Sequence, residues 1–427
     1  MIPPSSTPVA VDRCPGLLRP HLAVDGAVVR IRLPGGRISG AALAGLGAAA
    51  DTFADGHLQL TSRANLQLRG VPVDEAGEVP DALVDAVRSA GLLPSDSAEL
   101  IRNIVCSPLT GRIGGLADLR PVVEQLDQLL RETPALTALS GRFLFGLDDG
   151  RGDIVGTGSD VGVLAVSASS VALVAGGYRG PVVGLEDAAA RVVDLALRFL
   201  DRRAAAPESW HVAELPGGGE ALLAAVSGTL ADAAAPAVPS AGQAPRYGAH
   251  QQSDGRSALS LVVPLGRLTQ AQVGAVVQAA AYGSGELIVT PWHGLVVSDL
   301  PMAPSSAEVT ALAASLTAAG LPSTADSGWI GVTACTGAPG CGRAGGATAP
   351  VAARIAASVN AHPVHVVACE RRCGAPAVAH REVLVDSTGE RSSHRPALSL
   401  RTDDGRARRR RATPAAPFVS ATAPENR

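Results

Sequence analysis

Four of the six cysteines in this chain form two short clusters near its C-terminal end. The first is Cys335-Thr-Gly-Ala-Pro-Gly-Cys341, and the second is Cys369-Glu-Arg-Arg-Cys373. Four converging thiolates can bind a [4Fe–4S] cluster or a zinc ion. Structural zinc sites usually place about two to four residues between paired cysteines, and the gap in the first pair is wider. The spacing favours an iron–sulfur cluster and leaves zinc, or cysteines without a shared role, as alternatives.

The segments around the clusters predict how the two pairs meet. Residues 329–334 and 363–368 are typical of short buried strands that end at Cys335 and Cys369. Residues 351–358, which follow Pro350, are typical of a helix. A strand–helix–strand unit makes its two strands parallel, so their carboxyl ends share one edge of the sheet. We therefore expect both cysteine pairs to emerge at the same edge.

Composition limits the classes of function. The 427 residues are 46% hydrophobic and 18% charged, with a net charge of −3, which suits a globular protein and gives no indication of a nucleic-acid partner. Residues 1–8 lack a basic segment followed by an apolar one, so a secretion signal and disulfides are not expected. The most apolar stretch, 161–175, is interrupted by serines and predicts strands rather than a membrane span. We expect a cytoplasmic protein. It contains no lysine, so arginine is its abundant cation.

The chain also repeats itself. Four segments recur in the same order about 230 residues later. With their counterparts they are Leu33–Arg37 and Val263–Arg267, Leu58–Thr61 and Leu287–Thr290, Ala90–Ser95 and Ala319–Ser323, and Cys106 and Cys335. This offset is far longer than the period of about 20 to 50 residues found in solenoid repeats. We therefore predict a duplicated protein with pseudo-two-fold symmetry.

Each copy has the same expected order of elements: a strand, a helix, a strand pair and a second helix. The expected ranges are 27–33, 41–50, 58–68 and 81–90 in the first copy, and 258–263, 270–281, 287–297 and 307–319 in the second. This order predicts an α+β unit with helices on one face of a sheet. Gly217–Gly219 and 233–243 are candidate linkers, and the arginine-rich tail from residue 402 is expected to be disordered.

Polar residues recur at alternate positions of Thr61-Ser-Arg63-Ala-Asn65-Leu-Gln67-Leu-Arg69-Gly70, and Arg102-Asn103 forms a second polar pair. Guanidinium groups bind carboxylates bidentately, and carboxamides add directional hydrogen bonds. These motifs, with the repeat and the cysteines, resemble the nitrite and sulfite reductase superfamily. The resemblance implies that Arg63, Asn65, Gln67, Arg69, Arg102 and Asn103 bind the carboxylates of a tetrapyrrole, and that Cys335, Cys341, Cys369 and Cys373 bind a [4Fe–4S] cluster.

The same resemblance implies an α+β, pseudo-two-fold duplicated architecture. It consists of two ferredoxin-like half-domains and two α+β domains that bind the cluster and the tetrapyrrole. The implied boundaries are 13–75 and 76–232 in the first copy, 245–305 and 306–400 in the second, and 402–427 for the disordered tail.

The opening of the chain is similar to that of the precorrin-3B synthase family. The similarity lies in Cys14-Pro-Gly-Leu-Leu-Arg-Pro20, Asp25-Gly26 and Arg30-Ile-Arg-Leu-Pro-Gly-Gly36. It implies a [4Fe–4S] cluster, a mononuclear non-haem iron, and precorrin-3A in the place of sirohaem. The implied reaction uses dioxygen and an electron donor, either a partner reductase or an NADH-linked donor. It hydroxylates a meso carbon and closes a lactone to give precorrin-3B.

Two other functions remain open. A sirohaem-dependent sulfite or nitrite reductase needs clustered cations for its anionic substrate, and the corresponding segment 141–146 offers Arg142 and then apolar Leu144. That contrast favours the oxygenase. A non-catalytic, metal-stabilised binding protein is the third interpretation.

Some residues keep more than one interpretation. Histidines that could bind the non-haem iron by chemistry alone are His211, His250, His293, His362 and His365. His293 is either functional or a turn residue. Arg371 and Arg372 lie near the cluster, near substrate carboxylates, or in a solvated loop. Cys14 and Cys106 are expected to be small buried hydrophobic residues.

Overall fold

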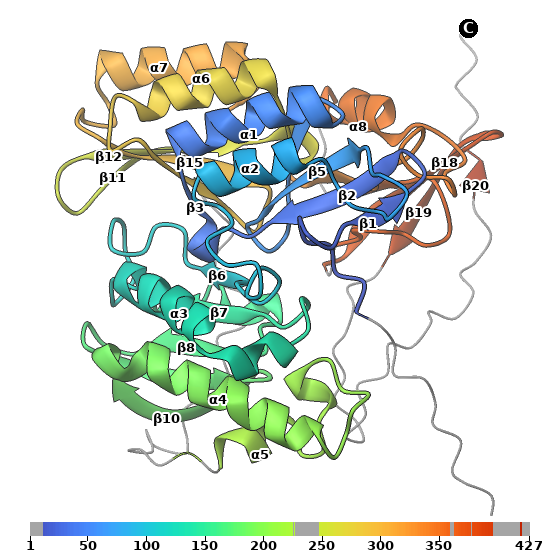
Figure 1. Ribbon diagram of the computed structural model, residues 1–427. Helices are drawn as coiled ribbons and strands as arrows, with labels where there is room; N and C mark the ends of the chain where they lie inside the picture. Colours follow the sequence, from blue (N-terminus) through green and yellow to red (C-terminus); the bar gives the residue numbers. More distant parts are fainter. Residues whose placement is uncertain are drawn as a thin grey trace, which may run out of the picture.

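The computed structural model describes residues 12–224, 226, 247–358, 363–376 and 378–395, together with the backbone of 419–420. The described residues form four five-stranded sheets. Two belong to the repeated half-domains, and we call them the first and second half-domain sheets. The other two contain parallel crossovers, and we call them the first and second crossover sheets. Figure 1 shows the half-domain sheets beneath a layer of helices, with the first crossover sheet on the opposite side.

The two half-domain sheets exchange a strand. The first has the order β1 (His21–Ala23), β2 (Gly26–Ile31), β5 (Leu66–Val71), β4 (His57–Leu60) and β13 (Arg267–Thr269). The second has the order β11 (Gly248–Gln251), β12 (Ser257–Val262), β15 (Gly294–Leu300), β14 (Glu286–Val289) and β3 (Arg37–Ser39). Strand β13 of the second copy pairs with β4 of the first, and β3 pairs with β14. Each sheet is completed by the other copy.

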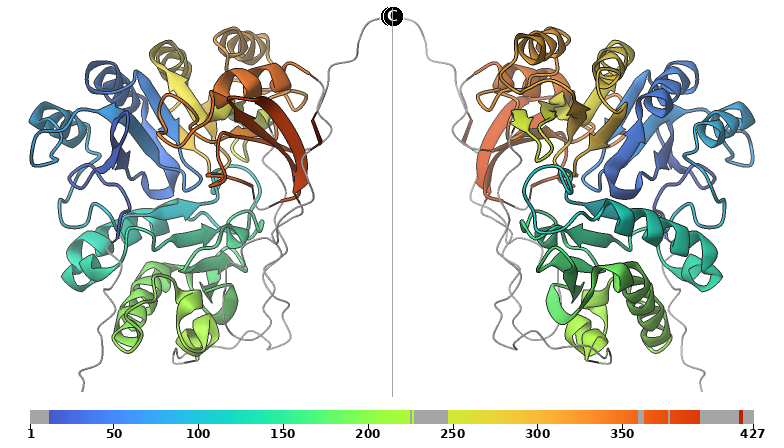
Figure 2. Two further views of the ribbon diagram at one scale, coloured as in Figure 1. Left: turned by 90° about the vertical axis from the view of Figure 1, so that its right-hand side faces the viewer. Right: turned by 90° about the vertical axis from the view of Figure 1, so that its left-hand side faces the viewer.

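Four helices cover one face of these sheets. They are α1 (Gly40–Phe53), α2 (Asp81–Ser89), α6 (Gln270–Ala280) and α7 (Ala307–Ala318). Helices α1 and α6 begin after Ser39 and Thr269, whose hydroxyls accept hydrogen bonds from backbone N–H groups of the first turn. The helices lie side by side in the order α2, α1, α6, α7 (Figures 1 and 2). These elements confirm the predicted order in both copies.

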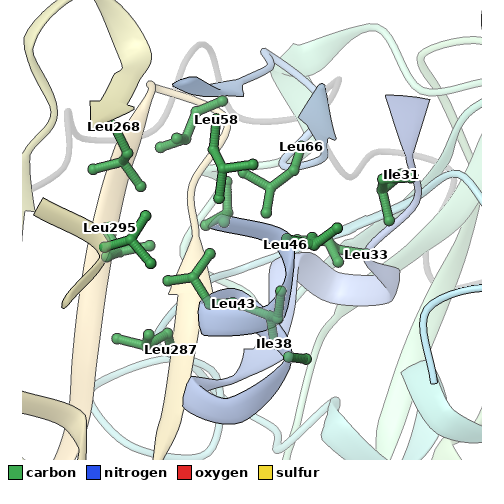
Figure 3. Packing of buried hydrophobic residues seen from close by; sticks show 14 of the residues in the cluster. Ile31, Leu33, Ile38, Leu43, Leu46, Leu58, Leu66, Leu268, Leu287 and Leu295 are labelled. Atoms are coloured by element: carbon green, nitrogen blue, oxygen red, sulfur yellow. The ribbon is translucent and has the colours of Figure 1, made fainter. Parts of the chain in front are cut away.

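One hydrophobic core joins the two half-domains. It includes Leu43 and Leu46 of α1, Leu66 of β5, and Leu287 and Leu295 of the second copy, all at most 1% exposed. Figure 3 shows these side chains packed together across the boundary between the copies. Because burial of apolar surface is the main stabilising term in folding, the two halves depend on each other for their stability.

The crossover sheets repeat one topology. The first contains β6 (Ile104–Cys106), β7 (Phe145–Asp148), β8 (Val161–Ala165), β9 (Ser170–Ala175) and β10 (Tyr178–Gly184). The second contains β16 (Val332–Ala334), β17 (Val364–Val367), β18 (His380–Asp386), β19 (Gly389–Arg395) and β20 (Val419–Ser420). In each, the first three strands are parallel and the last two are antiparallel. The duplication therefore extends beyond the half-domains.

Helices complete these two units. Helix α3 (Arg120–Glu132) connects β6 to β7, and α8 (Thr348–Ala356) connects β16 to β17. In the first unit, α4 (Ala188–Arg203) and α5 (Gly218–Leu223) follow β10. The expected linker at Gly217–Gly219 is wrong, because Gly219 packs so tightly on β9 that a Cβ there would lie 1.8 Å from the Ala175 carbonyl oxygen. Residues 233–243, the tail 402–427 apart from the 419–420 backbone, and parts of the expected domains lie outside the described residues.

In the part of the chain that the structure describes, no helix is both long enough and apolar enough to cross a membrane.

Candidate functional site

The two cysteine loops begin at one edge of the second crossover sheet. Strands β16 and β17 are parallel, with Ala334 opposite Val366, and the backbone N–H of Cys335 donates to the Val366 carbonyl oxygen at 2.9 Å. Cys369 follows β17 after one intervening residue. The long loop that contains Cys341 returns to the same place, because the N–H of Gly345 donates to the Ala368 carbonyl oxygen at 2.8 Å. The predicted convergence of the two loops is present.

The sulfur of Cys335 lies in the electrostatic field of the second pair. Burial raises the pKa of the Cys335 thiol, and the negative charge on the thiolates of Cys369 and Cys373 raises it further. The backbone N–H groups of Ala368 and Gly337 point to the same sulfur and act in the opposite direction. A bound cation would instead lower the pKa of these thiols and keep them deprotonated. Soft sulfur ligands with nearby N–H groups are the donors that a [4Fe–4S] cluster requires, and Cys369 and Cys373 lie near enough to Cys335 to affect its pKa. Among the described residues, no three of the cysteine sulfurs lie within 4.8 Å of one another.

The Cys335–Cys341 loop is held between two units. Its Gly340 carbonyl oxygen accepts a hydrogen bond of 2.7 Å from Arg69, which also forms a bidentate pair with Asp25 at 2.9 and 3.1 Å. A Cβ at Gly342 would lie 2.5 Å from the side chain of Val24. Figure 1 shows the second crossover sheet beside β1 and β2 of the first half-domain sheet. Arg69 therefore connects the polar motif of the first copy directly to the cysteine loop.

A polar row crosses the first half-domain sheet on the face opposite the helices. Arg30 of β2 donates to Gln67 of β5 at 2.9 Å, and Gln67 donates to Gln59 of β4 at 3.1 Å. Along β5, Asn65, Gln67 and Arg69 occupy alternate positions, so they share this face. At 3.3 Å per residue, the row from Asn65 to Arg69 is about 13 Å long. It leads from the first crossover sheet to the cysteine loop.

The second copy has an apolar face at the equivalent positions. Ser260, Val296 and Ile288 replace Arg30, Gln67 and Gln59 in the same strand register. Val296 and Ile288 form a buried cluster with Ala258 and pack against loop residues of the first copy. One face therefore retains polar groups for a ligand, whereas the other is closed by protein.

Like Gln67 and Arg69, three more of the six predicted tetrapyrrole-binding residues, Asn65, Asn103 and Arg102, have hydrogen-bond partners within the protein. Asn65 is fully buried, accepts from the N–H of Leu33 at 2.9 Å and donates to Asn103 at 2.9 Å. Asn103 in turn donates to the Phe143 carbonyl oxygen at 3.2 Å. Arg102 forms a bidentate pair with Asp127 at 2.6 and 3.2 Å. The two asparagines thus join the half-domain to the first crossover sheet.

The sequence analysis did not assign Arg30, which is half-buried and belongs to the polar row, or Arg32, which is buried beside it. Arg32 is 2% exposed, and among the residues that the structure describes its Nε and Nη1 have no hydrogen-bond partner; Arg30 Nε also lacks one there. Burial lowers the pKa of both side chains, that of Arg32 to about 10, and the positive charge of Arg30 contributes to the shift of Arg32. A desolvated guanidinium with unused donors is costly unless an anion pairs with it. The sequence pattern that could have identified these two residues is the alternation of arginines in Arg30-Ile-Arg32 within a buried strand.

Cys14 is also part of this region. Its sulfur lies 3.7 Å from Arg32 Nη2 and 3.9 Å from Arg30 Nη1, and its thiol donates to the Gly141 carbonyl oxygen at 3.1 Å. Cys14 therefore lies among cations, which differs from the apolar environment expected for it. Cys106, by contrast, is 3% exposed within the core of the first crossover unit, as expected.

Arg63, in the turn between β4 and β5, also contacts the Gly141 carbonyl oxygen. Its Nη1 lies 3.5 Å from the Gly141 oxygen, and burial lowers the pKa of its guanidinium. Arg142, which follows Gly141 in the chain, is exposed, and its guanidinium carbon lies 5.3 Å from the centre of the Trp210 ring. Leu144 is 3% exposed, and its segment precedes β7 rather than belonging to a strand. The positive charges of Arg30 and Arg63 both lower the pKa of Arg32, so these three cations lie close together, and we call them the arginine region.

The candidate iron ligands are dispersed. His211 bonds to Asp160, and His365 is buried on β17 with its Nδ1 at 2.9 Å from Thr333 Oγ1. His293 lies in the β14–β15 turn with φ +60°, the counterpart of Ala64 with φ +55°. His362 lies outside the described residues, and His250 lies on β11.

Among the described residues, the group of three possible ligands whose atoms lie within 4.8 Å of one another is Asp148, Asp149 and Asp153. Asp148 accepts four backbone N–H hydrogen bonds, and Asp149 pairs with Arg151. These contacts explain the group as part of a tight loop after β7. The described histidines do not form an iron site of three ligands, so we derive no step from a non-haem iron.

Arg371 and Arg372 differ in their environment. Arg372 lies 2.9 Å from Glu382, a residue that is 1% exposed, and 2.8 Å from Glu370. Arg371 is exposed. Arg372 therefore fixes the Cys369–Cys373 loop to β18.

Comparisons with known proteins agree with this architecture. Residues 21–86 and 250–314 each match the family model described as the nitrite/sulfite reductase ferredoxin-like half domain. A precorrin-3B synthase of Sinorhizobium sp. is 26% identical over 389 residues, which cover 85% of this chain and 78% of the relative. The solved structure of the Mycobacterium tuberculosis NirA protein matches with a TM-score of 0.59 at 19% identity, covering 88% of this chain and 75% of that one. The expected resemblances are confirmed: the chain has two nitrite/sulfite reductase ferredoxin-like half domains, its duplicated fold is similar to that of the NirA protein, and its sequence is similar to that of a precorrin-3B synthase.

Proposed function

We propose that the chain is a tetrapyrrole oxidoreductase that converts precorrin-3A to precorrin-3B with dioxygen and an electron donor. The observation that carries this proposal is the polar row of the first half-domain sheet, which runs from buried arginines with unused donors to the cysteine loop. The sequence similarity to a precorrin-3B synthase supports the choice of substrate. Cytoplasmic location, and the reductase or NADH-linked donor as partner, remain expectations.

The arginines provide the substrate-binding part of the proposal. Arg63, with Arg30 and Arg32, binds carboxylates of the macrocycle. Among the described residues, Arg30 Nε and Arg32 Nε and Nη1 lack protein partners, and Arg63 Nη1 makes only a long contact. Gln67 adds a directional group, while Asn65, Asn103 and Arg102 hold the surrounding backbone and Arg69 holds the cysteine loop. This assignment keeps the six residues at the site and divides them between ligand binding and support.

The cysteines provide the redox part. Cys335, Cys341, Cys369 and Cys373 hold the [4Fe–4S] cluster in the proposal. When bound, such a cluster supplies single electrons at a potential set by nearby charges and hydrogen bonds. The N–H groups of Ala368 and Gly337 at Cys335, and the charge of Arg372, are the features of this chain that would tune it.

A second candidate function is reduction of sulfite or nitrite on sirohaem. The half-domain match and the exposed cation Arg142 favour it. Leu144 argues against it, because a buried apolar residue next to Arg142 cannot stabilise charge on a small anion. Dioxygen is neutral and does not need that charge.

The test uses anaerobically purified, cluster-loaded protein, precorrin-3A, a low-potential reductant and isotopically labelled dioxygen, with mass spectrometry of the tetrapyrrole. We expect one labelled oxygen atom in the product, and a large loss of product for Arg63→Leu but not for the exposed control Arg88→Leu. Intense sirohaem bands with sulfite or nitrite reduction, and no labelled product, would establish the second function. A colourless protein without iron would support the binding protein.

A further inference from the structure

A carboxylate–imidazole pair lies beside the arginine region. Asp160, which directly precedes β8, is 3% exposed, and both of its oxygens lie 3.2 Å from His211 Nδ1. The same oxygens accept from the N–H groups of Val212 and Leu144, each at 2.9 Å. Because all other partners of this carboxylate are donors, it accepts from His211 as well, and the proton of the neutral imidazole is on Nδ1.

The position of His211 is fixed by its own segment. Glu214 in the following 3-10 turn accepts from the backbone N–H groups of Trp210 at 2.6 Å and His211 at 3.1 Å. With Nδ1 held by Asp160, Nε2 is the ring nitrogen that gains and loses a proton. The side chain of His211 is 33% exposed. The imidazole is thus oriented and accessible.

Several contacts place this pair at the substrate region. Leu144, whose N–H is bound by Asp160, belongs to the segment that includes Gly141, which Arg63 contacts. Trp210, the neighbour of His211, lies beneath Arg142. The charged groups that face His211 are Asp160, Glu214 and Arg63. Asp160 raises the pKa of His211, burial and Arg63 lower it, and Glu214 raises it, with a net upward shift.

We propose that His211 is the proton donor of the tetrapyrrole site, with Asp160 as its positioning residue. This inference rests on the proposed function. Insertion of one oxygen atom into a C–H bond consumes dioxygen, two electrons from the donor and two protons, and releases water. In the proposed step the Nε2–H bond of the imidazolium breaks and an O–H bond forms on the oxygen that leaves as water; solvent supplies the second proton of that water. The neutral imidazole then takes a proton from solvent. General acids of this kind contribute about 10²- to 10⁴-fold to rate.

The test measures kcat and KM for precorrin-3A oxygenation from pH 5.5 to 9 with cluster-loaded protein. For the wild type, kcat should fall as pH rises through the pKa of His211, since the donor is then deprotonated. His211→Gln should lower kcat about 100-fold or more at every pH and should abolish the fall of kcat at high pH. The KM of this variant should stay within a few fold of the wild-type value. Asp160→Asn should shift the fall of kcat to lower pH, because it removes the largest cause of the raised pKa of His211.

His57→Gln is the matched control. His57 also lies near an aspartate, with its Nδ1 at 3.7 Å from Asp55 Oδ1, but it lies on β4, opposite Thr269 of β13. This variant should behave as the wild type. If His211→Gln keeps the wild-type kcat and its fall at high pH, or changes only KM, the proton-donor role is wrong while the proposed function stands. If the wild type yields no oxygenated product, both fall together.

Discussion

Replacement of Arg69 by leucine tests whether the first half-domain holds the cysteine loop. The wild-type side chain is 12% exposed and makes three hydrogen bonds, two to Asp25 and one to the Gly340 carbonyl oxygen. Breaking a fully buried ion pair costs about 3 to 5 kcal/mol. Because Asp25 is 21% exposed, the lower end applies, so we expect about 3 kcal/mol of lost loop stability.

Hydrogen exchange measured by mass spectrometry gives the direct assay. In the wild type, loop amides are held by Ala338 N–H to Gly346 and Gly345 N–H to Ala368, at 2.9 and 2.8 Å. A loss of about 3 kcal/mol corresponds to roughly 100-fold faster exchange through local opening. Iron release to a chelator should accelerate in parallel.

Arg88→Leu is the control, since Arg88 forms ion pairs with Asp85 and Asp96 but is 46% exposed. Exposed pairs contribute about 0 to 1 kcal/mol, so loop exchange should remain within a few fold of wild type. Equal exchange in the two variants would refute the assignment of Arg69 as the support of the loop. A double-mutant cycle with Asp25→Asn should give a coupling of about 1 to 3 kcal/mol.

Further substitutions test other parts of the structure. Burial is the main cause that raises the pKa of Asp153 to about 6, so ionisation of its carboxyl destabilises the fold progressively as pH rises toward that value, and in full above it. Asp153→Asn should therefore stabilise by at most about 3 kcal/mol at pH 8 and by much less near pH 4, as urea unfolding at both pH values would reveal; equal effects would contradict the pKa. Asn65→Ala should cost about 3 kcal/mol in urea unfolding, because it leaves buried groups unpaired, and a cost below 1 kcal/mol would argue against its structural role. Gly337→Ala should impair cluster retention, since φ is +66° and the new Cβ would lie 2.6 Å from Thr348; full iron content would contradict this.

The sequence predicted the half-domains well because their signals are local. Alternating strands, capping residues such as Ser39 and Thr269, and repeated anchors define elements without knowledge of distant contacts. The exchange of β3 and β13 between the copies was not predictable in this way. It depends on pairing between strands about 230 residues apart, which leaves no local pattern.

The candidate site was predicted in composition but less well in detail. The paired cysteines have a recognisable spacing, and the strand–helix–strand unit fixes their edge of the sheet. The division of the polar residues between ligand binding and support depends on partners distant in sequence, such as Asn103 for Asn65 and Gly340 for Arg69. The burial of Arg32 and its contact with Cys14 likewise became evident only from packing, because they depend on residues 18 positions apart in the sequence.

The central claim is that four cysteines bind one iron–sulfur cluster beside the arginine region. Iron and acid-labile sulfide analysis of anaerobically purified protein, with electron paramagnetic resonance after reduction, tests it most directly. We predict about four iron and four sulfide per chain, lost in Cys335→Ala, Cys341→Ala, Cys369→Ala and Cys373→Ala and retained in the buried control Cys106→Ala. Zinc without sulfide in the wild type, or a full cluster after removal of any of the four thiols, would contradict the account.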